Sequence, residues 1–159
     1  MNTQTKFKPD QYRTVTPYLT VRGAARALEF YQKAFGAKEL FRIDAGEGRI
    51  GHAEIQIGDS IIMLSDEYPD MGSVGPETLG GTAVSLLVYV DDCDAVYDRA
   101  VKAGATPARP LQNMFYGDRS GTVKDPFGHQ WYISTHIEDV APDELMRRAE
   151  AAMKQPQQA

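Results

Sequence analysis

One pattern of strand, helix and three further strands occurs twice in this sequence, and the duplication constrains the fold more than any other feature. The copies run over residues 16–65 and 85–134. Equivalent positions lie 69 residues apart, as in the pairs Thr16/Ser85, Val21/Val90 and Met63/Tyr132. A repeated supersecondary unit predicts that two similar modules build the protein together.

In the first copy, periodicity predicts strands at 14–21, 38–43, 50–57 and 60–65 and a helix at 24–35 that Gly36 caps. The Gly58-Asp59 pair predicts a tight hairpin with Glu54 opposite Met63. One face of this hairpin is apolar and the other is polar. We therefore expect the helix to cover the apolar face.

The second copy predicts strands at 84–90, 106–111, 119–124 and 129–135, with a helix at 93–103 that Gly104 caps. Asp91 or Asp92 is the expected N-cap of this helix. A four-residue turn at 125–128 would place Arg119 on the face of Tyr132, whereas a bulge would reverse this.

These elements divide the chain into five parts. We expect an N-terminal tail at 1–13, modules at 14–65 and 82–138, a linker at 66–81, and a C-terminal helix and tail at 139–159, with the helix at 142–154. Segment 66–81 is rich in Gly and Pro, and a lid over a pocket is the alternative to a linker.

Composition excludes several classes of partner. A net charge of −5 and a pI of about 5.2 argue against nucleic acid. Residues 1–13 contain no apolar run, and no later stretch has membrane-spanning length, so we expect neither a secretory signal nor a membrane anchor. The single cysteine, Cys93, cannot form an internal disulfide, which favours a reducing cytoplasm. Its place on the apolar stripe of its helix favours a core position over the alternative of a nucleophile.

Several motifs carry a family resemblance. They are Ala27-Leu28-Glu29-Phe30-Tyr31, Gly51-His52-Ala53-Glu54, Gly117-Asp118-Arg119 and Asp125-Pro126-Phe127-Gly128-His129-Gln130-Trp131. With them the chain resembles the vicinal oxygen chelate superfamily of glyoxalases, bleomycin-resistance proteins and dioxygenases, and within it the PhnB-like branch. The resemblance implies an α+β fold of two βαβββ modules whose curved mixed sheets surround a shared cavity. It also implies a homodimer.

The resemblance further implies where a metal would bind, with one His, Gln or Glu on the first and fourth strands of each module. The chain has Thr16, Met63, Ser85 and Tyr132 at these positions, and none is an ordinary ligand of a divalent first-row metal. We therefore expect no metal at the standard site and no cofactor. The His52/Glu54 and His136/Glu138 pairs remain alternative sites, because residues two apart on a strand share a face.

Strand alternation predicts the wall of the cavity. The expected ligand-binding residues are Thr16, Tyr18, Gln56, Met63, Ser85, Tyr89, Tyr116 and Arg119, and the candidate acid–base groups are Glu54 and Tyr132. Arg119 binds a ligand anion or, in the alternative, contacts Asp118.

Three functions remain open from the sequence. The first is binding of a small organic molecule without a metal. The second is a lyase, isomerase or dioxygenase that uses an atypical metal or Glu54 with a tyrosine. The third is a non-catalytic interaction module.

Overall fold

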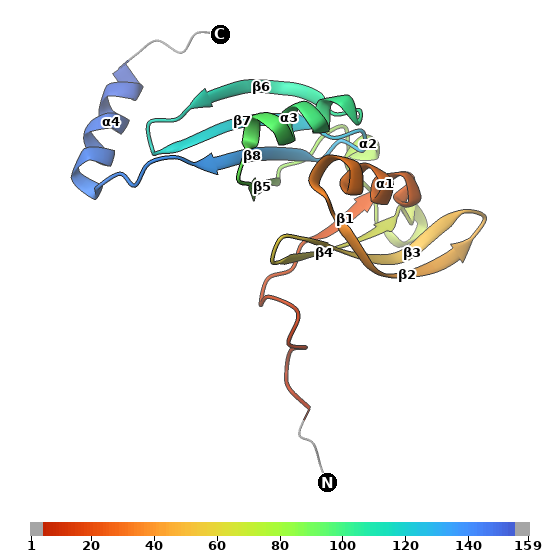
Figure 1. Ribbon diagram of the computed structural model, residues 1–159. Coiled ribbons are helices and arrows are strands. Elements are labelled where there is room, and N and C mark those ends of the chain that lie inside the picture. The colour runs from red at the N-terminus through yellow and green to blue at the C-terminus, as the bar shows by residue number, and fades with distance from the viewer. Residues whose placement is uncertain (1–4, 155–159) are drawn as a thin grey trace. The chain divides into compact units, whose positions relative to one another are not determined.

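The computed structural model describes residues 5–154 and contains two four-stranded mixed sheets, one from each half of the chain (Figure 1). The strand orders are β1-β4-β3-β2 and β5-β8-β7-β6, and the expected α+β fold of two βαβββ modules is confirmed. The strands are β1 (Tyr18–Val21), β2 (Lys38–Gly46), β3 (Arg49–Ile57), β4 (Ser60–Asp66), β5 (Ser85–Tyr89), β6 (Thr106–Asn113), β7 (Asp118–Lys124) and β8 (Gln130–His136). The helices are α1 (Ala24–Phe35), α2 (Pro76–Leu79), α3 (Cys93–Lys102) and α4 (Pro142–Lys154), with a short 3₁₀ turn, η1 (Pro69–Met71).

The chain divides into two compact units. The first contains the described residues up to Thr82 together with Pro126–Gly128, and the second contains Ala83–Asp125 and the residues from His129 onwards.

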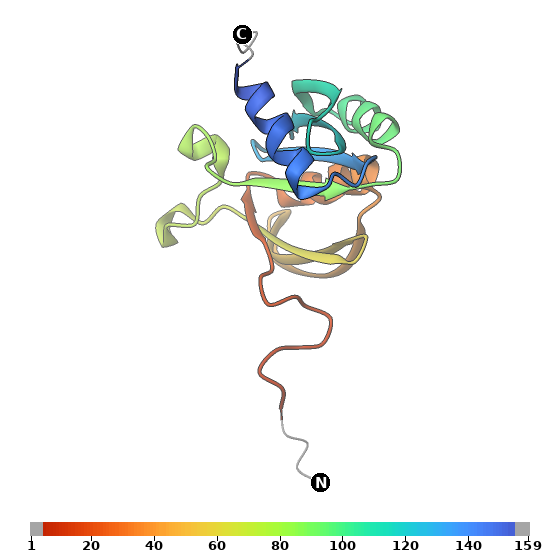
Figure 2. The same cartoon turned by 90° about the vertical axis from the view of Figure 1, so that its left-hand side faces the viewer.

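Helix α1 covers one side of the first sheet, and the segment 5–17 approaches the sheet from the other side (Figures 1 and 2). The buried residues of α1 recur at helical spacing and include Leu28, Tyr31 and Phe35. Gly36 ends the helix with φ 67°, and its amide donates to the Gln32 carbonyl oxygen. A residue with a Cβ adopts this left-handed backbone only with strain, so the predicted cap is confirmed.

Strand β1 begins at Tyr18, later than the predicted start at residue 14. Pro17 gives the physical reason, because it has no amide hydrogen to donate to a sheet. Its carbonyl still accepts a hydrogen bond from the Met63 amide at 2.9 Å. Thr16 therefore lies before the sheet and not on its first strand.

The β3–β4 hairpin turns at Gly58-Asp59 and has the predicted register, with Glu54 opposite Met63 and Gln56 opposite Ile61. The face towards α1 is buried to at least nine-tenths at Ala53, Ile55, Ile57, Ile62 and Leu64. Burying an aliphatic side chain of this kind stabilises the fold by about 1.5–3 kcal/mol. This face and α1 form the core of the first unit.

The sequence repeat is preserved in the pairing of the strands. Tyr18 lies opposite Met63 in the first sheet, and Leu87 lies opposite Tyr132 in the second. Leu87 follows Tyr18 by 69 residues, and Tyr132 follows Met63 by the same interval. The duplication is therefore structural as well as sequential.

The starts of the two main helices are also equivalent. The Ala24 amide donates to the Asp66 carboxylate at 2.9 Å, and the Cys93 amide donates to the Thr135 hydroxyl at 2.9 Å. The two acceptors lie near the ends of β4 and β8. In each unit, a strand distant in sequence thus binds the first amide of the helix.

In the second unit, Asp92 and not Asp91 caps α3, because its carboxylate accepts from the Ala95 amide at 3.0 Å. The side of this sheet towards α3 buries Val123, Trp131 and Ile133. The β7–β8 register pairs Lys124 with Gln130, so the turn has five residues instead of the predicted four.

The predicted linker packs on the first unit. The Glu67 carboxylate accepts from the Gly75 amide at 2.7 Å and from the Thr78 hydroxyl at 2.6 Å. The hydrogen bond from Thr78 has the larger effect, followed by that from Gly75, and both lower the pKa of Glu67. A Cβ at Gly75 would lie 2.6 Å from the Thr20 carbonyl oxygen, so this segment approaches β1 closely. The alternative of a lid stays a prediction.

Helix α4 has the bounds that the sequence predicted. Arg148 fixes it through two hydrogen bonds to Glu138, of 2.8 and 2.7 Å, and one to Glu144 of 2.8 Å. Among residues 5–154, no helix combines the length and apolar character needed to cross a membrane.

Candidate functional site

The open face of the first sheet, opposite α1, carries a row of side chains with one from each strand. Phe41 on β2 lies opposite Glu54 on β3, Glu54 opposite Met63 on β4, and Met63 opposite Tyr18 on β1. Directly opposed residues share a face and contact one another. The structure thus brings together Tyr18, Glu54 and Met63, which the sequence predicted, and adds Phe41.

A chain of short contacts crosses this open face. The Tyr12 hydroxyl donates to Glu54 Oε1 at 2.7 Å, His52 Nε2 lies 3.3 Å from the same oxygen, and the Tyr18 hydroxyl lies 3.0 Å from His52 Nδ1. The side chains of Glu54 and His52 are only 13% and 23% exposed. The sheet therefore holds a carboxylate and an imidazole together in a largely dehydrated place.

The Tyr12–Glu54 hydrogen bond raises the pKa of Tyr12, and burial and the carboxylate charge act in the same direction. The phenol consequently stays protonated and acts as a donor. Both contacts use Oε1, and within residues 5–154 Glu54 Oε2 has no hydrogen-bond partner and is not buried. One carboxylate oxygen is therefore available to an incoming donor.

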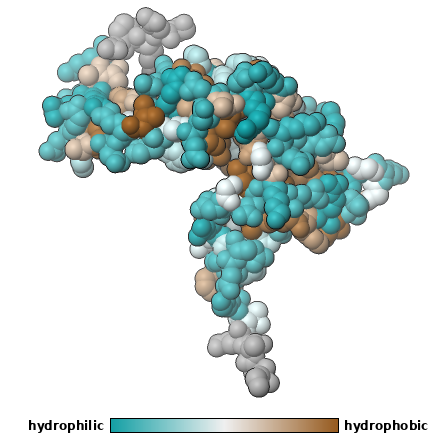
Figure 3. Space-filling model, viewed as in Figure 1, coloured by the Kyte–Doolittle hydropathy of each residue, from teal (hydrophilic) through white to brown (hydrophobic). Residues whose placement is uncertain are grey.

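Aromatic rings lie near His52, whose Nε2 contacts the Glu54 carboxylate. The ring centroid of His52 lies 5.6 Å from that of Tyr18 and 6.3 Å from that of Phe41. Tyr18, Phe41 and Ile43 are each 51% exposed. Figure 3 shows hydrophobic side chains gathered on the underside of the region that contains β2 and β3.

Sequence reasoning missed Tyr12 and Phe41. Tyr12 lies in a segment predicted to be a tail, where an aromatic residue among polar ones was the available signal. Phe41 follows a β-bulge, since Glu39 pairs with Ile55 but Phe41 pairs with Glu54. The bulge shifts the alternation of inward and outward residues, which a sequence pattern does not record.

Two predicted wall residues of the first unit lie outside this cluster. The Gln56 amide donates to the Gly58 carbonyl oxygen at 3.0 Å and so fastens the hairpin turn. The Thr16 hydroxyl donates to the Arg13 carbonyl oxygen at 3.1 Å, in the segment before β1.

The equivalent row of the second sheet has different chemistry. It contains Leu87, Tyr132, Thr122 and Arg109, from β5, β8, β7 and β6. This row contains no carboxylate. The two copies have therefore kept the register of β1–β4 in β5–β8 and diverged in their side chains.

A second polar cluster surrounds Asp118. The Tyr89 hydroxyl donates to Asp118 at 2.8 Å, and His136 lies 2.8 Å from Asp118 through Nδ1 and 2.9 Å from Asp139 through Nε2. Hydrogen bonding to Asp118, followed by Asp139, raises the pKa of His136. With both ring nitrogens directed at carboxylates, His136 is suited to holding a positive charge and not to accepting a proton.

Two other predicted residues of the second unit are Tyr116, which precedes β7, and Ser85, which begins β5. Burial, followed by the negative charge of Asp118, raises the pKa of Tyr116, whose ring contacts Phe115 edge to face at 5.3 Å. Ser85 lies at the other end of β5 from Tyr89, opposite Gln130. Tyr89 and Tyr116 thus lie near Asp118, whereas Ser85 lies apart.

Arg119 does not share the face of Tyr132. It pairs with Thr135, while Tyr132 pairs with Thr122, because the longer turn shifts the register by one residue. On the α3 side Arg119 forms two hydrogen bonds of 2.7 Å to Asp94. Arg119 thus forms an ion pair with helix α3, and its contact with a ligand anion stays a prediction.

Comparison with known families agrees with this architecture. The family model of the Glyoxalase/Bleomycin resistance protein/Dioxygenase superfamily matches residues 11–133. The chain belongs to this superfamily.

Individual relatives span most of the chain. An uncharacterized protein of Mycobacterium tuberculosis is 42% identical over 134 residues, which are 82% of this chain and 79% of the relative. Lactoylglutathione lyase of Neisseria meningitidis is 29% identical over 119 residues, 74% of this chain and 86% of that enzyme. The PhnB protein of Bacillus cereus has the same fold, with a TM-score of 0.62 at 20% identity over 77% of this chain and 99% of that one.

The positions at which the superfamily resemblance implies metal ligands do not fit a divalent first-row metal. Thr16 lies before the sheet, and Met63, Ser85 and Tyr132 offer a thioether and two hydroxyls. Such metals are bound in proteins by imidazole, carboxylate or thiolate groups. No group of three or more His, Cys, Asp and Glu side chains within residues 5–154 is arranged to hold a metal ion.

Of the two alternative pairs, only one has its side chains close together. His52 Nε2 and Glu54 Oε1 lie 3.3 Å apart on the open face, so a metal site at this pair stays a prediction. His136 contacts Asp118 and Asp139, whereas Glu138 binds Arg148.

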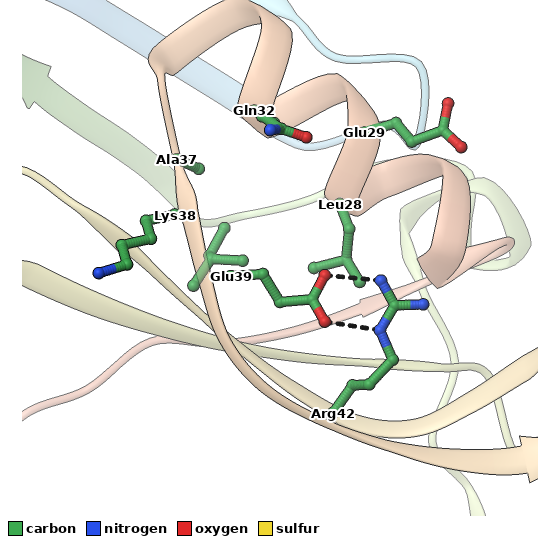
Figure 4. Close-up of a pocket in the computed structure, with 8 residues that line it drawn as sticks. Leu28, Glu29, Gln32, Ala37, Lys38, Glu39 and Arg42 are labelled. Atoms are coloured by element: carbon green, nitrogen blue, oxygen red, sulfur yellow. Dashed lines mark hydrogen bonds and ion pairs between the residues drawn. The ribbon is translucent and has the colours of Figure 1, made fainter.

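A cavity of about 450 Å³ lies on the other side of the first sheet, between α1 and β2 (Figure 4). None of the predicted wall residues lines it. The open-face cluster and this cavity lie on opposite sides of the sheet, because Glu54 and Ile55 are adjacent on β3 and point to opposite faces. Glu54, His52 and the two tyrosines, which are side chains able to exchange protons, lie together at the open face and not at this cavity.

Proposed function

We propose that the open face of the first sheet binds a small organic cation without a metal ion. The observation that supports this most directly is the Glu54 carboxylate, which is largely withdrawn from water and keeps one oxygen without a partner among residues 5–154. The exposed ring of Phe41 belongs to the residue opposite Glu54, and the exposed ring of Tyr18 contacts His52 beside it.

A carboxylate beside aromatic faces favours an ammonium group for two reasons. A charge-assisted hydrogen bond contributes about 1.5–3 kcal/mol. A cation over an aromatic face adds about 0.5–2 kcal/mol, and more as water is excluded. The net charge of −5 also attracts cations to the protein.

Calorimetric titration with benzylamine and with its uncharged analogue benzyl alcohol tests this proposal. We expect Glu54→Gln to weaken benzylamine binding by about tenfold, equivalent to roughly 1.4 kcal/mol, and to leave benzyl alcohol nearly unaffected. Asp59→Asn is the matched control, because it removes the same charge at an exposed turn beside Arg13. Equal losses in both variants, or equal affinity for amine and alcohol, would contradict a specific cation site.

The second candidate is a lyase or isomerase in which Glu54 moves a proton. The continuous contacts from Tyr12 through Glu54 and His52 to Tyr18 favour this, because they join donors and acceptors over the open face. The likeness to lactoylglutathione lyase names one reaction to assay, the isomerisation of a hemithioacetal of glutathione. Within this proposal Tyr132 stays a candidate proton donor of the second unit.

The enzyme and the binding protein are distinguished by turnover. Hemithioacetal consumption that Glu54→Gln abolishes would favour the enzyme, and so would stoichiometric Zn, Ni, Mn or Fe in protein purified without chelator or a metal-affinity tag. Saturable binding of benzylamine without turnover of the hemithioacetal would favour the binding protein.

We also propose that the chain forms a homodimer in the cytoplasm, as its superfamily resemblance and its single buried cysteine suggest. Light scattering coupled to size-exclusion chromatography measures the oligomeric state. A mass near 17.6 kDa at micromolar concentration would contradict the dimer.

A further inference from the structure

The cavity between α1 and β2 is separate from the open face. Its apolar floor consists of Leu28, Ala37 and Ile55, which are 5%, 5% and 1% exposed. Ile55 points towards α1, while its neighbour Glu54 points to the open face. The sheet itself therefore lies between the cavity and the open-face cluster.

The bulge in β2 gives this cavity its polar wall. Residues 39 and 42 would point to opposite faces of a regular strand, because they are an odd number of positions apart. The register instead pairs Glu39 with Ile55 and Arg42 with Ala53, so both side chains lie on the α1 side. Bulges commonly re-aim side chains in this way at functional places.

There Glu39 and Arg42 form two parallel hydrogen bonds of 2.6 Å (Figure 4). The bonds to Arg42 lower the pKa of Glu39, and those to Glu39 raise the pKa of Arg42, so the pair stays ionised. A bidentate pair of this kind is planar. It presents a flat polar surface next to Leu28 of the apolar floor.

We propose that this cavity binds a neutral, planar heteroaromatic molecule of one or two rings. The lining contains Glu29, Glu39, Lys38 and Arg42, whose charges cancel, so it gives no preference for an ion. A guanidinium plane stacks well on an aromatic face, and the floor removes the ring from water. The Gln32 side chain provides both a donor and an acceptor for a ring heteroatom.

The volume agrees with this class of ligand. Small-molecule sites span about 300–1,000 Å³, and about 450 Å³ lies at the lower end of that range. A cofactor-sized molecule would extend beyond the cavity. The site is also independent of the proposed function, because it uses none of the open-face side chains.

An NMR titration of the ¹⁵N-labelled protein with indole tests this inference. We expect saturable shifts confined to residues 28–42 and 55, with a dissociation constant of about 1 mM. Ala37→Leu fills the floor and should abolish the shifts. Arg42→Gln, at a half-exposed position that folding tolerates, should weaken binding by about threefold to fivefold through loss of stacking.

His52→Ala on the open face is the control and should bind indole as the unchanged protein does. Saturable shifts that map to the open face or to the second unit would overturn the assignment. So would the absence of saturation at concentrations about ten times the expected constant, or unchanged affinity in Arg42→Gln.

Discussion

The Asp66 carboxylate is the point at which the first unit should be most sensitive to a single substitution. Asp66 is 6% exposed and accepts hydrogen bonds from the amides of Gly23, Ala24 and Ile50 at 2.7, 2.9 and 2.8 Å. It thus joins the start of α1 to β3. Helix α1 has no capping side chain of its own, because Gly23 precedes it.

Asp66→Ala would leave the two fully buried amides, those of Ala24 and Ile50, without an acceptor. Each such loss costs about 1.5–2 kcal/mol, which gives about 3–4 kcal/mol in the free energy of unfolding. With a urea dependence of about 2 kcal/mol/M, the unfolding midpoint should fall by about 1.5–2 M. Circular dichroism during urea unfolding measures this shift.

Asp66→Asn is the matched variant. It keeps an acceptor for the helix amides, while its NH₂ group faces the Ile50 amide, so the expected cost is about 1–2 kcal/mol. The reasoning would be refuted if Asp66→Ala cost less than about 1 kcal/mol, or if both substitutions had the same effect.

Two further predictions concern other parts of the chain. Gly117→Ala should destabilise the protein by more than about 2 kcal/mol, because Gly117 has φ 98° and a Cβ would lie 2.1 Å from the Glu138 carbonyl oxygen. Gly36→Ala is the control. Its φ is 67° and its Cβ would meet open space, so it should cost only about 1 kcal/mol in the same urea measurement. The raised pKa of His136 implies that its contacts with Asp118 and Asp139 contribute stability below about pH 6.5 and lose it as pH rises through the raised value. Unfolding midpoints from pH 5 to 9 should therefore decline less in His136→Gln than in the unchanged protein, and parallel curves would contradict this role.

The two hairpin turns show which parts of the fold a local sequence pattern predicts and which parts it does not. The hairpin at Gly58-Asp59 is set by turn chemistry that adjacent residues contain, and its register placed Glu54 opposite Met63 as predicted. The turn at 125–129 differs because its length depends on how Asp125 is bound. That carboxylate accepts from the His129 amide and the Trp131 indole, both at 2.9 Å, and the extra residue moves Arg119 to the α3 side.

The sequence by itself determined the duplicated βαβββ pattern, the ends of α1 and α4 and the apolar faces, because spacing along the chain fixes which side chains share a side. The predicted cap at Gly104 was wrong, because α3 ends at Lys102 and Ala103 caps it. Together with the superfamily resemblance, the sequence also predicts hydroxyl and thioether groups at the positions of the metal ligands. The tertiary structure alone decided that Tyr12 reaches Glu54, that the β2 bulge brings Phe41 to the open face and pairs Glu39 with Arg42, and that Arg119 binds Asp94. These contacts depend on strand register and on residues far apart in sequence, where a shift of one position reverses the direction of a side chain.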